Sequence, residues 1–190
     1  MKAKRLLLML ALLIGALAGT RAETISTTYV DLNGKTQSVS ATVLTTETAT
    51  LASGWYVVNS WLRNHNRIRV ESGASVNLII TDNTSFYNLK GMTVNEGSSL
   101  TVWGQATSNG KWIVEDADID CACIGGEPMD GGNSNSGVIT INGCDIKAVK
   151  SSERGRYTYP QGAAIGGGGN SRAFHGNVED DEEVGTSPAE

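Results

Sequence analysis

Four acidic side chains stand at a spacing that could hold a metal ion. In the segment EDADIDCACIGGE, Asp116, Asp118 and Asp120 alternate along the chain, and Glu127 is the twelfth residue counted from Asp116. Calcium loops of the EF-hand type place oxygen ligands at such intervals, with a glycine at the sixth position. Here the sixth position is Cys121, and alternating acids also describe the outward face of a strand. The segment therefore predicts either a calcium site or a solvated acidic face, and calcium is the one cofactor that the sequence suggests.

Aromatic residues offer a second kind of chemistry, because an exposed ring can stack against the C–H face of a sugar. Val102 is expected to point inward in its strand, so the next residue, Trp103, is expected to point outward. The same reasoning turns Trp112 outward, and Tyr157 and Tyr159 lie in a charged loop. These four rings form the predicted sugar-binding surface. The alternative is that they cover loops or pack between turns.

Three cysteines follow the first 22 residues: Cys121, Cys123 and Cys144. An odd number in an exported chain allows one disulfide and one remaining thiol. Cys123 and Cys144 are 21 residues apart, about one turn of a stack of short strands, where neighbouring residues come within disulfide reach. The prediction is a Cys123–Cys144 disulfide, and the alternative is three small buried core residues. Two distant histidines do not complete a zinc ligand set.

Two glycine-rich steps, ACIGG at 122–126 and AAIGG at 163–167, lie 41 positions apart. A phosphate-binding loop needs a following helix and usually a Gly-Lys-Ser/Thr sequence, and neither step has them. We therefore interpret both as corners where the backbone turns tightly and neighbouring turns of the chain stack closely.

The charge balance and the missing catalytic motifs narrow the function further. The net charge is −5, and removal of an N-terminal signal with four basic residues would make it −9. No basic surface that would attract nucleic acid is predicted. There is no Ser/His/Asp arrangement and no HExxH motif, although Lys111, Lys147, Arg154 and Arg156 stand near acids and leave a lyase-type base conceivable. We predict no catalytic residues and no enzyme.

The elements that position these residues repeat along the chain. RIRVESGASVNL matches GMTVNEGSSLTV at an offset of 24, so that Val76 aligns with Leu100. SLTVWG then matches VITING at an offset of 39, which aligns Leu100 with Ile139. Short strands rich in Val, Ile, Thr and Trp with a period of this length are typical of stacked coils. The predicted strands are 55–59, 67–70, 75–80, 91–94, 100–103, 111–114, 138–141 and 145–149. The predicted fold is all-β, a right-handed parallel β-helix, with an antiparallel β-sandwich as the alternative.

The sequence predicts that the chain is divided into four segments. Residues 1–22 read as a signal peptide, with a basic start, an apolar run and small residues before a cut at Glu23. Residues 23–53 form an N-terminal cap, in which Asn33-Gly34 predicts a hairpin turn. The β-helix spans 54–170. Residues 171–190 are predicted to be a disordered acidic tail.

These segments resemble a known family. SGWYVVNS, NRIRVESGASVNLIITDNTSF, KGMTVNEGSSLTVWGQ, ACIGG, GVITINGCDIKAV and GAAIGGGGN are similar to the right-handed, pectin-lyase-like β-helix region of secreted and surface proteins of gut bacteria that carry the carbohydrate-binding-domain label. The resemblance covers about Leu32 to Asn170. It implies adhesion or glycan binding and supplies no catalytic residues.

Together these observations predict a secreted or cell-surface module that binds carbohydrate or another surface polymer without cleaving it. A glycan-cleaving enzyme or a degenerate relative of one is the first alternative, and a structural spacer of a surface protein is the second. The mature chain is expected to be a monomer, with no membrane span after signal cleavage and no nucleic-acid partner.

Overall fold

The computed structural model describes residues 22–115, 117, 121–128, 135–149 and 162–169. This part of the chain is all-β, with no helix and with fifteen strands in three sheets. Sheet A has the order β1 (Thr24–Val30), β2 (Thr36–Val43), β4 (Gly54–Val58), β7 (Ser75–Ile80), β10 (Ser99–Trp103) and β13 (Val138–Asn142). Sheet B has the order β3 (Thr50–Leu51), β6 (Ile68–Val70), β9 (Met92–Thr93), β12 (Ile124–Gly125) and β15 (Ile165–Gly166). Sheet C has the order β5 (Leu62–Asn64), β8 (Ser85–Asn88), β11 (Lys111–Val114) and β14 (Asp145–Ala148).

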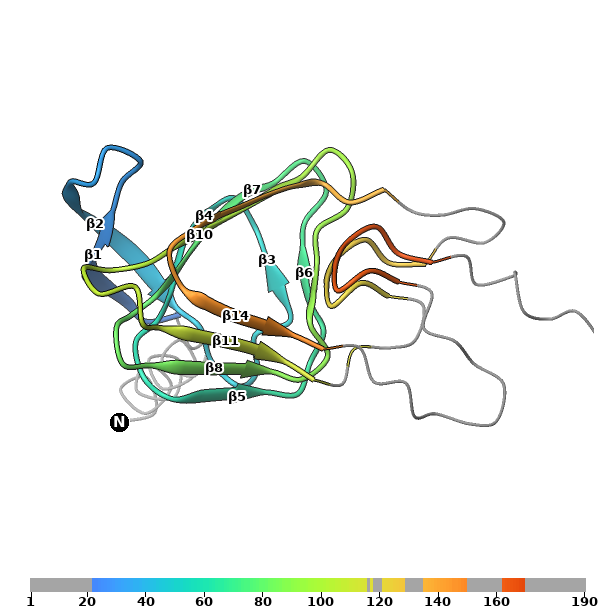
Figure 1. Cartoon of the computed structure of the whole chain (residues 1–190), viewed down its shortest axis with the longest axis horizontal. Helices are drawn as coiled ribbons and strands as arrows, with labels where there is room; N and C mark the ends of the chain where they lie inside the picture. The colour runs from blue at the N-terminus through green and yellow to red at the C-terminus, as the bar shows by residue number, and fades with distance from the viewer. Residues whose placement is uncertain (1–21, 116, 118–120, 129–134, 150–161, 170–190) are drawn as a thin grey trace, which may run out of the picture.

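From β3 onward the chain visits sheets B, A and C in rotation, and each strand pairs in parallel with its counterpart from the previous round. Figure 1 shows β4, β7 and β10 along one side of the molecule, β5, β8, β11 and β14 along a second, and β3 and β6 along a third. The β1–β2 pair is the antiparallel exception. Because every other strand pair in the three sheets is parallel, the alternative of an antiparallel sandwich is wrong.

The pairing registers are those that the aligned segments predict. Val76 pairs with Leu100. Leu100 pairs in turn with Ile139, and the two glycine corners pair at Ile124 and Ile165. All eight predicted strand segments contain a strand. β3 joins sheet B at Thr50–Leu51, so the stacked strands begin a few residues before the predicted start at 54.

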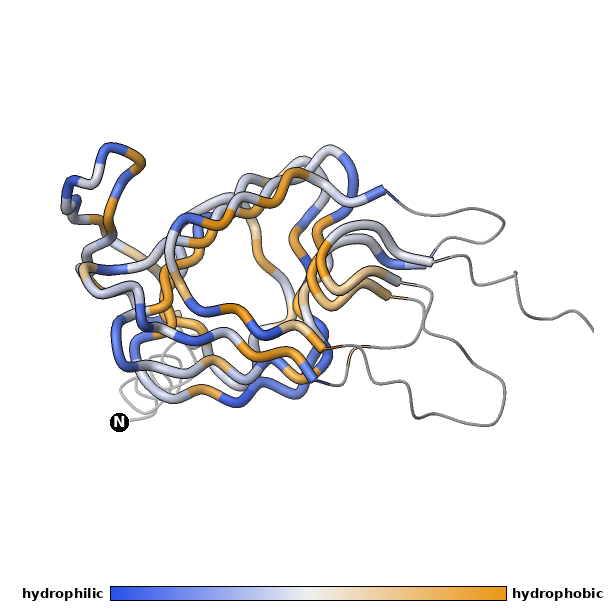
Figure 2. The backbone as a smooth tube through the Cα atoms, viewed as in Figure 1, coloured by the Kyte–Doolittle hydropathy of each residue, from blue (hydrophilic) through white to orange (hydrophobic). Residues whose placement is uncertain are grey.

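The core lies between the three sheets, because every second side chain of each strand points inward. Apolar and polar residues alternate along the strands (Figure 2). Leu78, Leu100 and Val102 are fully buried from sheet A. In sheet C the inward positions include Phe86 and Trp112, whose rings stack with centroids 5.7 Å apart.

The β1–β2 hairpin at the start of sheet A folds over the outer face of β4, β7 and β10, where Tyr29 contacts Trp55 and Trp103. Its strands β1 and β2 meet at a turn in which the Asp31 carboxylate accepts hydrogen bonds from the backbone N–H groups of Asn33 and Lys35, both at 2.9 Å. Gly34 has φ +74°, which a side chain would disfavour, so the predicted hairpin turn is confirmed. β2 pairs with β4 at the end of sheet A, and β1 reaches Gly104, whose carbonyl accepts a hydrogen bond from the Val30 N–H at 3.0 Å.

Sheet C contains two strands, β5 and β8, that the sequence did not predict. Their inward residues include two asparagines, Asn64 and Asn88, which are fully buried and pair in register. The Asn64 Nδ2 donates to the carbonyls of Thr45 and Thr48 at 3.0 and 2.8 Å. The Asn88 Nδ2 donates to the Asn66 carbonyl at 3.1 Å. At these two inward positions an amide that donates to backbone carbonyls takes the place of an apolar side chain. The alternation of apolar and polar residues that would predict β5 and β8 is therefore interrupted.

Several predictions lie outside the described residues: the signal peptide up to position 21, Asp116, Asp118, Asp120, Tyr157, Tyr159 and the acidic tail. β1 begins at Thr24, one residue after the predicted cut before Glu23. Among the described residues, no helix has the length and apolar character needed to cross a membrane.

Candidate functional site

The outer face of sheet C is made by the side chains that alternate with those in the core. Leu62, Phe86 and Trp112 point inward in register, so their neighbours point out. We call this surface the sheet C face and define it by Trp61, Arg63, Ser85, Tyr87, Lys111, Ile113, Asp145 and Lys147. The four strands lie side by side in Figure 1. At the usual strand spacing of about 4.8 Å, the face extends roughly 14 Å across the strands.

An aromatic pair stands at one end of this face. Trp61 immediately precedes β5 and is 64% exposed, which is unusual for so large a ring. Tyr87 comes from the neighbouring strand β8, and the two ring centroids are 6.0 Å apart with planes tilted by 49°. An exposed ring on a rigid sheet offers an apolar contact surface with little entropy left to lose on binding.

Charged side chains flank the aromatic pair. Arg63 is exposed and sits directly beside Tyr87 in the strand register. On the far strand, the Lys147 Nζ lies 3.1 Å from the Glu115 Oε1, an exposed pair that adds little stability. Arg63 has no ion pair with any other residue in the described part of the chain, so its guanidinium can bind a ligand oxygen next to an aromatic ring.

Of the four predicted aromatic residues, only Trp103 and Trp112 are among the described residues, and the structure places them on different sheets. Trp103 does point outward, but its ring lies on sheet A, 4.9 Å from Tyr29 and 6.0 Å from Trp55 beneath the hairpin. Its Nε1 donates to the Asn77 Oδ1 at 3.0 Å. The prediction that Trp112 points outward is wrong, because Trp112 is fully buried against Phe86 and offers no ring face to a ligand.

Sequence reasoning missed Trp61 and Tyr87 as members of a candidate binding surface. Locating them requires β5 and β8, and neither strand shows alternating Val, Ile and Thr. The signal that could have found them is the offset of 24 applied to sheet C, which aligns Leu62 with Phe86 and turns both neighbours outward.

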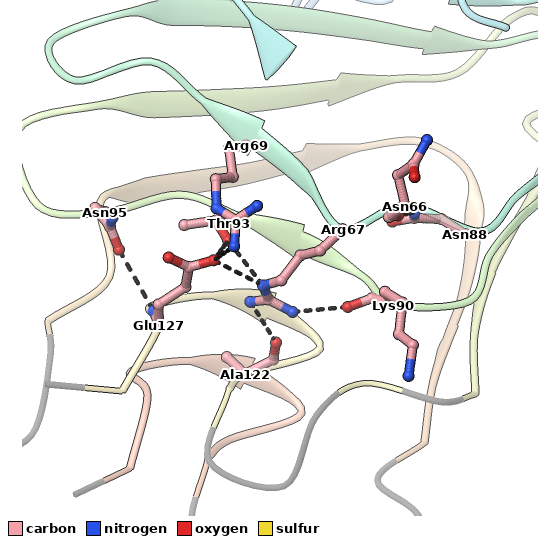
Figure 3. Close-up of polar contacts among 9 residues, drawn as sticks. All are labelled: Asn66, Arg67, Arg69, Asn88, Lys90, Thr93, Asn95, Ala122 and Glu127. Carbon is pink, nitrogen blue, oxygen red and sulfur yellow. Dashed lines mark hydrogen bonds and ion pairs between the residues drawn. The ribbon is translucent and has the colours of Figure 1, made fainter. Parts of the chain in front are cut away.

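A second polar cluster surrounds the buried Arg67, shown in Figure 3. Its Nη1 donates to the Lys90 carbonyl at 2.7 Å and its Nη2 to the Ala122 carbonyl at 2.9 Å. Its Nε donates to the Thr93 Oγ1 at 2.8 Å and lies 3.3 Å from the Glu127 Oε1. The guanidinium therefore joins three successive rounds of the chain at one corner.

Glu127 balances this buried charge. Its Oε1 also accepts from the Thr93 hydroxyl at 2.8 Å and pairs with the Arg69 Nη2 at 2.8 Å. Burial raises the pKa of Glu127, but the hydrogen bonds from Thr93 and Arg69 and the charges of Arg69 and Arg67 outweigh it and lower the pKa below 4.5. Glu127 is thus part of an arginine-centred network in the structure.

The calcium site stays a prediction at Asp116, Asp118 and Asp120, which lie outside the described residues. Within the described residues, no group of three histidine, cysteine or acidic side chains could hold a metal. The carboxylate of Glu127, the fourth predicted ligand, contacts two guanidinium groups, and a calcium ion would have to compete with both.

The lowered pKa of Glu127 gives the folded chain a defined pH dependence. A carboxylate whose folded pKa is depressed contributes stability above its ordinary value of 4.5, and this contribution is lost as the pH falls through the folded pKa. We expect Glu127→Gln to unfold at lower urea concentration than wild type at pH 7, and the difference to shrink below pH 4.5. Urea titrations at pH 7 and at about pH 3 measure it. An equal difference at both pH values would contradict the assignment.

The glycine corners are sites of backbone stacking, as the sequence predicts. Gly125 and Gly166 have φ values of +138° and +135° and pair in register. A Cβ on Gly125 would overlap the carbonyl of Gly166. Each corner also closes on itself, with Ala122 N–H donating to Gly126 O and Ala163 N–H to Gly167 O, both at 3.0 Å.

Cys123 and Cys144 are not joined by a disulfide in the structure, so that predicted pair is not formed. Cys123 is buried immediately before β12, in line with the alternative of a small core residue. The Cys144 Sγ donates to the Asp145 carbonyl at 3.6 Å. Burial, followed by the charge of Asp145, raises the pKa of the Cys144 thiol to about 12, so it stays protonated and unreactive at neutral pH.

Comparisons with known proteins supply no further assignment. No protein-family model matches the chain, no curated protein matches it, and no solved structure matches it. The candidate site therefore rests on the chain's own residues.

Proposed function

We propose that the chain is a right-handed parallel β-helix that is exported and binds carbohydrate without cleaving it, and that the sheet C face is its binding surface. The rotation of the chain through three parallel sheets supports the β-helix. Right-handedness is what parallel crossover connections nearly always adopt. Export follows from the predicted signal peptide.

The observation that carries the function is the exposed Trp61 beside Tyr87 on a rigid parallel sheet. Trp61 is 64% exposed. A ligand that covers this apolar surface would gain free energy from the hydrophobic effect. Two tilted rings suit a sugar chain, whose successive residues change orientation. Arg63 beside Tyr87 supplies a fork of donors for hydroxyl or carboxylate oxygens. A glycan running across the strands would meet all three side chains.

Replacing Trp61 with alanine is expected to weaken glycan binding by at least about tenfold while leaving stability within about 0.5 kcal/mol, because an exposed ring contributes little to the core. Tyr87→Ala is expected to weaken binding in the same direction. The chain from Glu23 onward is first applied to a glycan array of plant, mucin and bacterial polysaccharides. The best ligand is then titrated against each variant by calorimetry.

Leu32→Ala is the matched control, because Leu32 is 76% exposed but lies in the hairpin, away from the sheet C face. It should leave binding unchanged. Binding that survives in both aromatic variants would move the site elsewhere. Silence across the whole array would favour the spacer role, and released oligosaccharides would favour the lyase alternative.

A further inference from the structure

Among the described residues, the three sheets end on the same side of the stack. β13, β14 and β15 are the last strands of sheets A, C and B, and each has one side with no neighbouring strand among the described residues. In the described part of the chain these are three unpaired strand edges, which natural proteins normally cover, bulge or charge to prevent association.

Inward-pointing apolar residues are uncovered at this end. Ile141 aligns with Val102, yet Ile141 is 45% exposed and Val102 is fully buried. Ile165 aligns with Ile124, and the exposures are 41% and 1%. A further round of strands covers Val102 and Ile124. No described strand covers Ile141 and Ile165 in the same way. The apolar centre of the stack therefore continues to its surface.

The open edge of β13 also presents backbone hydrogen-bonding groups. The Val138 N–H donates to the Ser98 carbonyl at 3.1 Å, and the Asn142 carbonyl accepts from the Gly104 N–H at 2.9 Å. Both groups point toward β10. Because the direction alternates along a parallel strand, the N–H and C=O groups of Ile139 and Ile141 point to the open side.

We propose that this end is an interface for a second copy of the chain, with the two copies meeting end to end about a two-fold axis. A complementary partner must offer open strand edges arranged around an apolar centre, and the same end of a second copy does so. A two-fold axis across the stack reverses the strand direction, so β13 would meet β13 of the partner in antiparallel pairing. Such an isologous contact closes at two copies.

Two other occupants fit less well. The opposite end of the stack is a poorer match, because β2 already pairs with β4 at the edge of sheet A and would prevent head-to-tail growth there. The residues that follow β15 include NSRAFHGNVEDDEE, which lacks the alternating apolar residues shared by β7, β10 and β13. The proposal replaces the monomer expected from the sequence and does not depend on glycan binding.

Sedimentation velocity of the chain from Glu23 onward, over a micromolar concentration series, tests the proposal. Wild type is expected to sediment as a dimer. Ile141→Lys places a charge in the interface and is expected to give a monomer with the same far-UV circular dichroism. Thr140→Lys is the control, because Thr140 lies on the same strand but points to the outer face of sheet A, and it should stay dimeric.

Ile165→Lys repeats the test from sheet B, so a folding defect in one variant cannot decide the result alone. A wild-type chain that is monomeric throughout the series would overturn the proposal. Dimers that persist in both folded lysine variants would overturn it as well, since they would place the interface elsewhere.

Discussion

Alanine at Gly125 is expected to destabilise the chain by about 3 kcal/mol or more, because the new methyl group has no space and the backbone angle is unfavourable. The φ of Gly125 is +138°, and its Cβ would overlap the carbonyl oxygen, carbonyl carbon and nitrogen of Gly166, all backbone atoms. Rotation of a side chain cannot relieve this overlap. The midpoint of urea unfolding measures the loss, provided that the slope is unchanged.

Gly73→Ala is the matched control. Gly73 also has a positive φ, +73°, but a Cβ there meets no atom within 4 Å. Only the conformational strain of about 1 kcal/mol should remain. The difference between the two variants therefore measures the close backbone approach at Gly125 together with its more extreme φ. Equal losses would mean that the corner has room to adjust and that the two glycine steps are stacked loosely.

Arg67→Met is expected to lower the free energy of unfolding by about 3–5 kcal/mol, the usual cost of removing one partner of a buried ion pair. The guanidinium is the donor that the Lys90 and Ala122 carbonyls share, and it faces the Glu127 carboxylate. Methionine fills much of the space but donates no hydrogen bond. Thermal and urea unfolding measure the change.

Arg69→Met separates this effect from the loss of any arginine near Glu127. The Arg69 Nη2 lies closer to the Glu127 Oε1, at 2.8 Å, but its side chain is 56% exposed. Solvent screens such a pair, so the expected loss is below about 1 kcal/mol. If Arg69→Met proves as costly as Arg67→Met, charge pairing rather than burial holds the corner together.

Much of the strand arrangement could be predicted from sequence because stacking imposes matched positions. Val76, Leu100 and Ile139 occupy one inward column, so their shared offsets are sufficient to predict which strands pair and in which register. The glycine corners could be interpreted for the same reason, since two backbones that approach this closely leave room only for glycine.

The candidate binding surface was harder to predict, because it depends on the direction of each strand residue and not on its type. Trp112 is predicted to point outward and its neighbour Ile113 inward, whereas stacking against Phe86 requires the reverse. A one-residue error moves every side chain to the other face. In β5 the inward residue Asn64 is polar, so hydropathy alone could not fix the phase that exposes Trp61.

The hairpin has a consequence for how the chain loses its structure. A stack in which each round touches only its neighbours unfolds piecemeal, from the ends. Here, however, the Val30 carbonyl accepts a hydrogen bond from the Asn142 side chain at 3.2 Å, across 112 positions of sequence, and the Val30 N–H donates to Gly104. The end of β1 is therefore hydrogen-bonded to residues at the ends of β10 and β13, which belong to much later rounds of the chain. Fraying at β13 also loosens β1, and unfolding should approach a single cooperative transition.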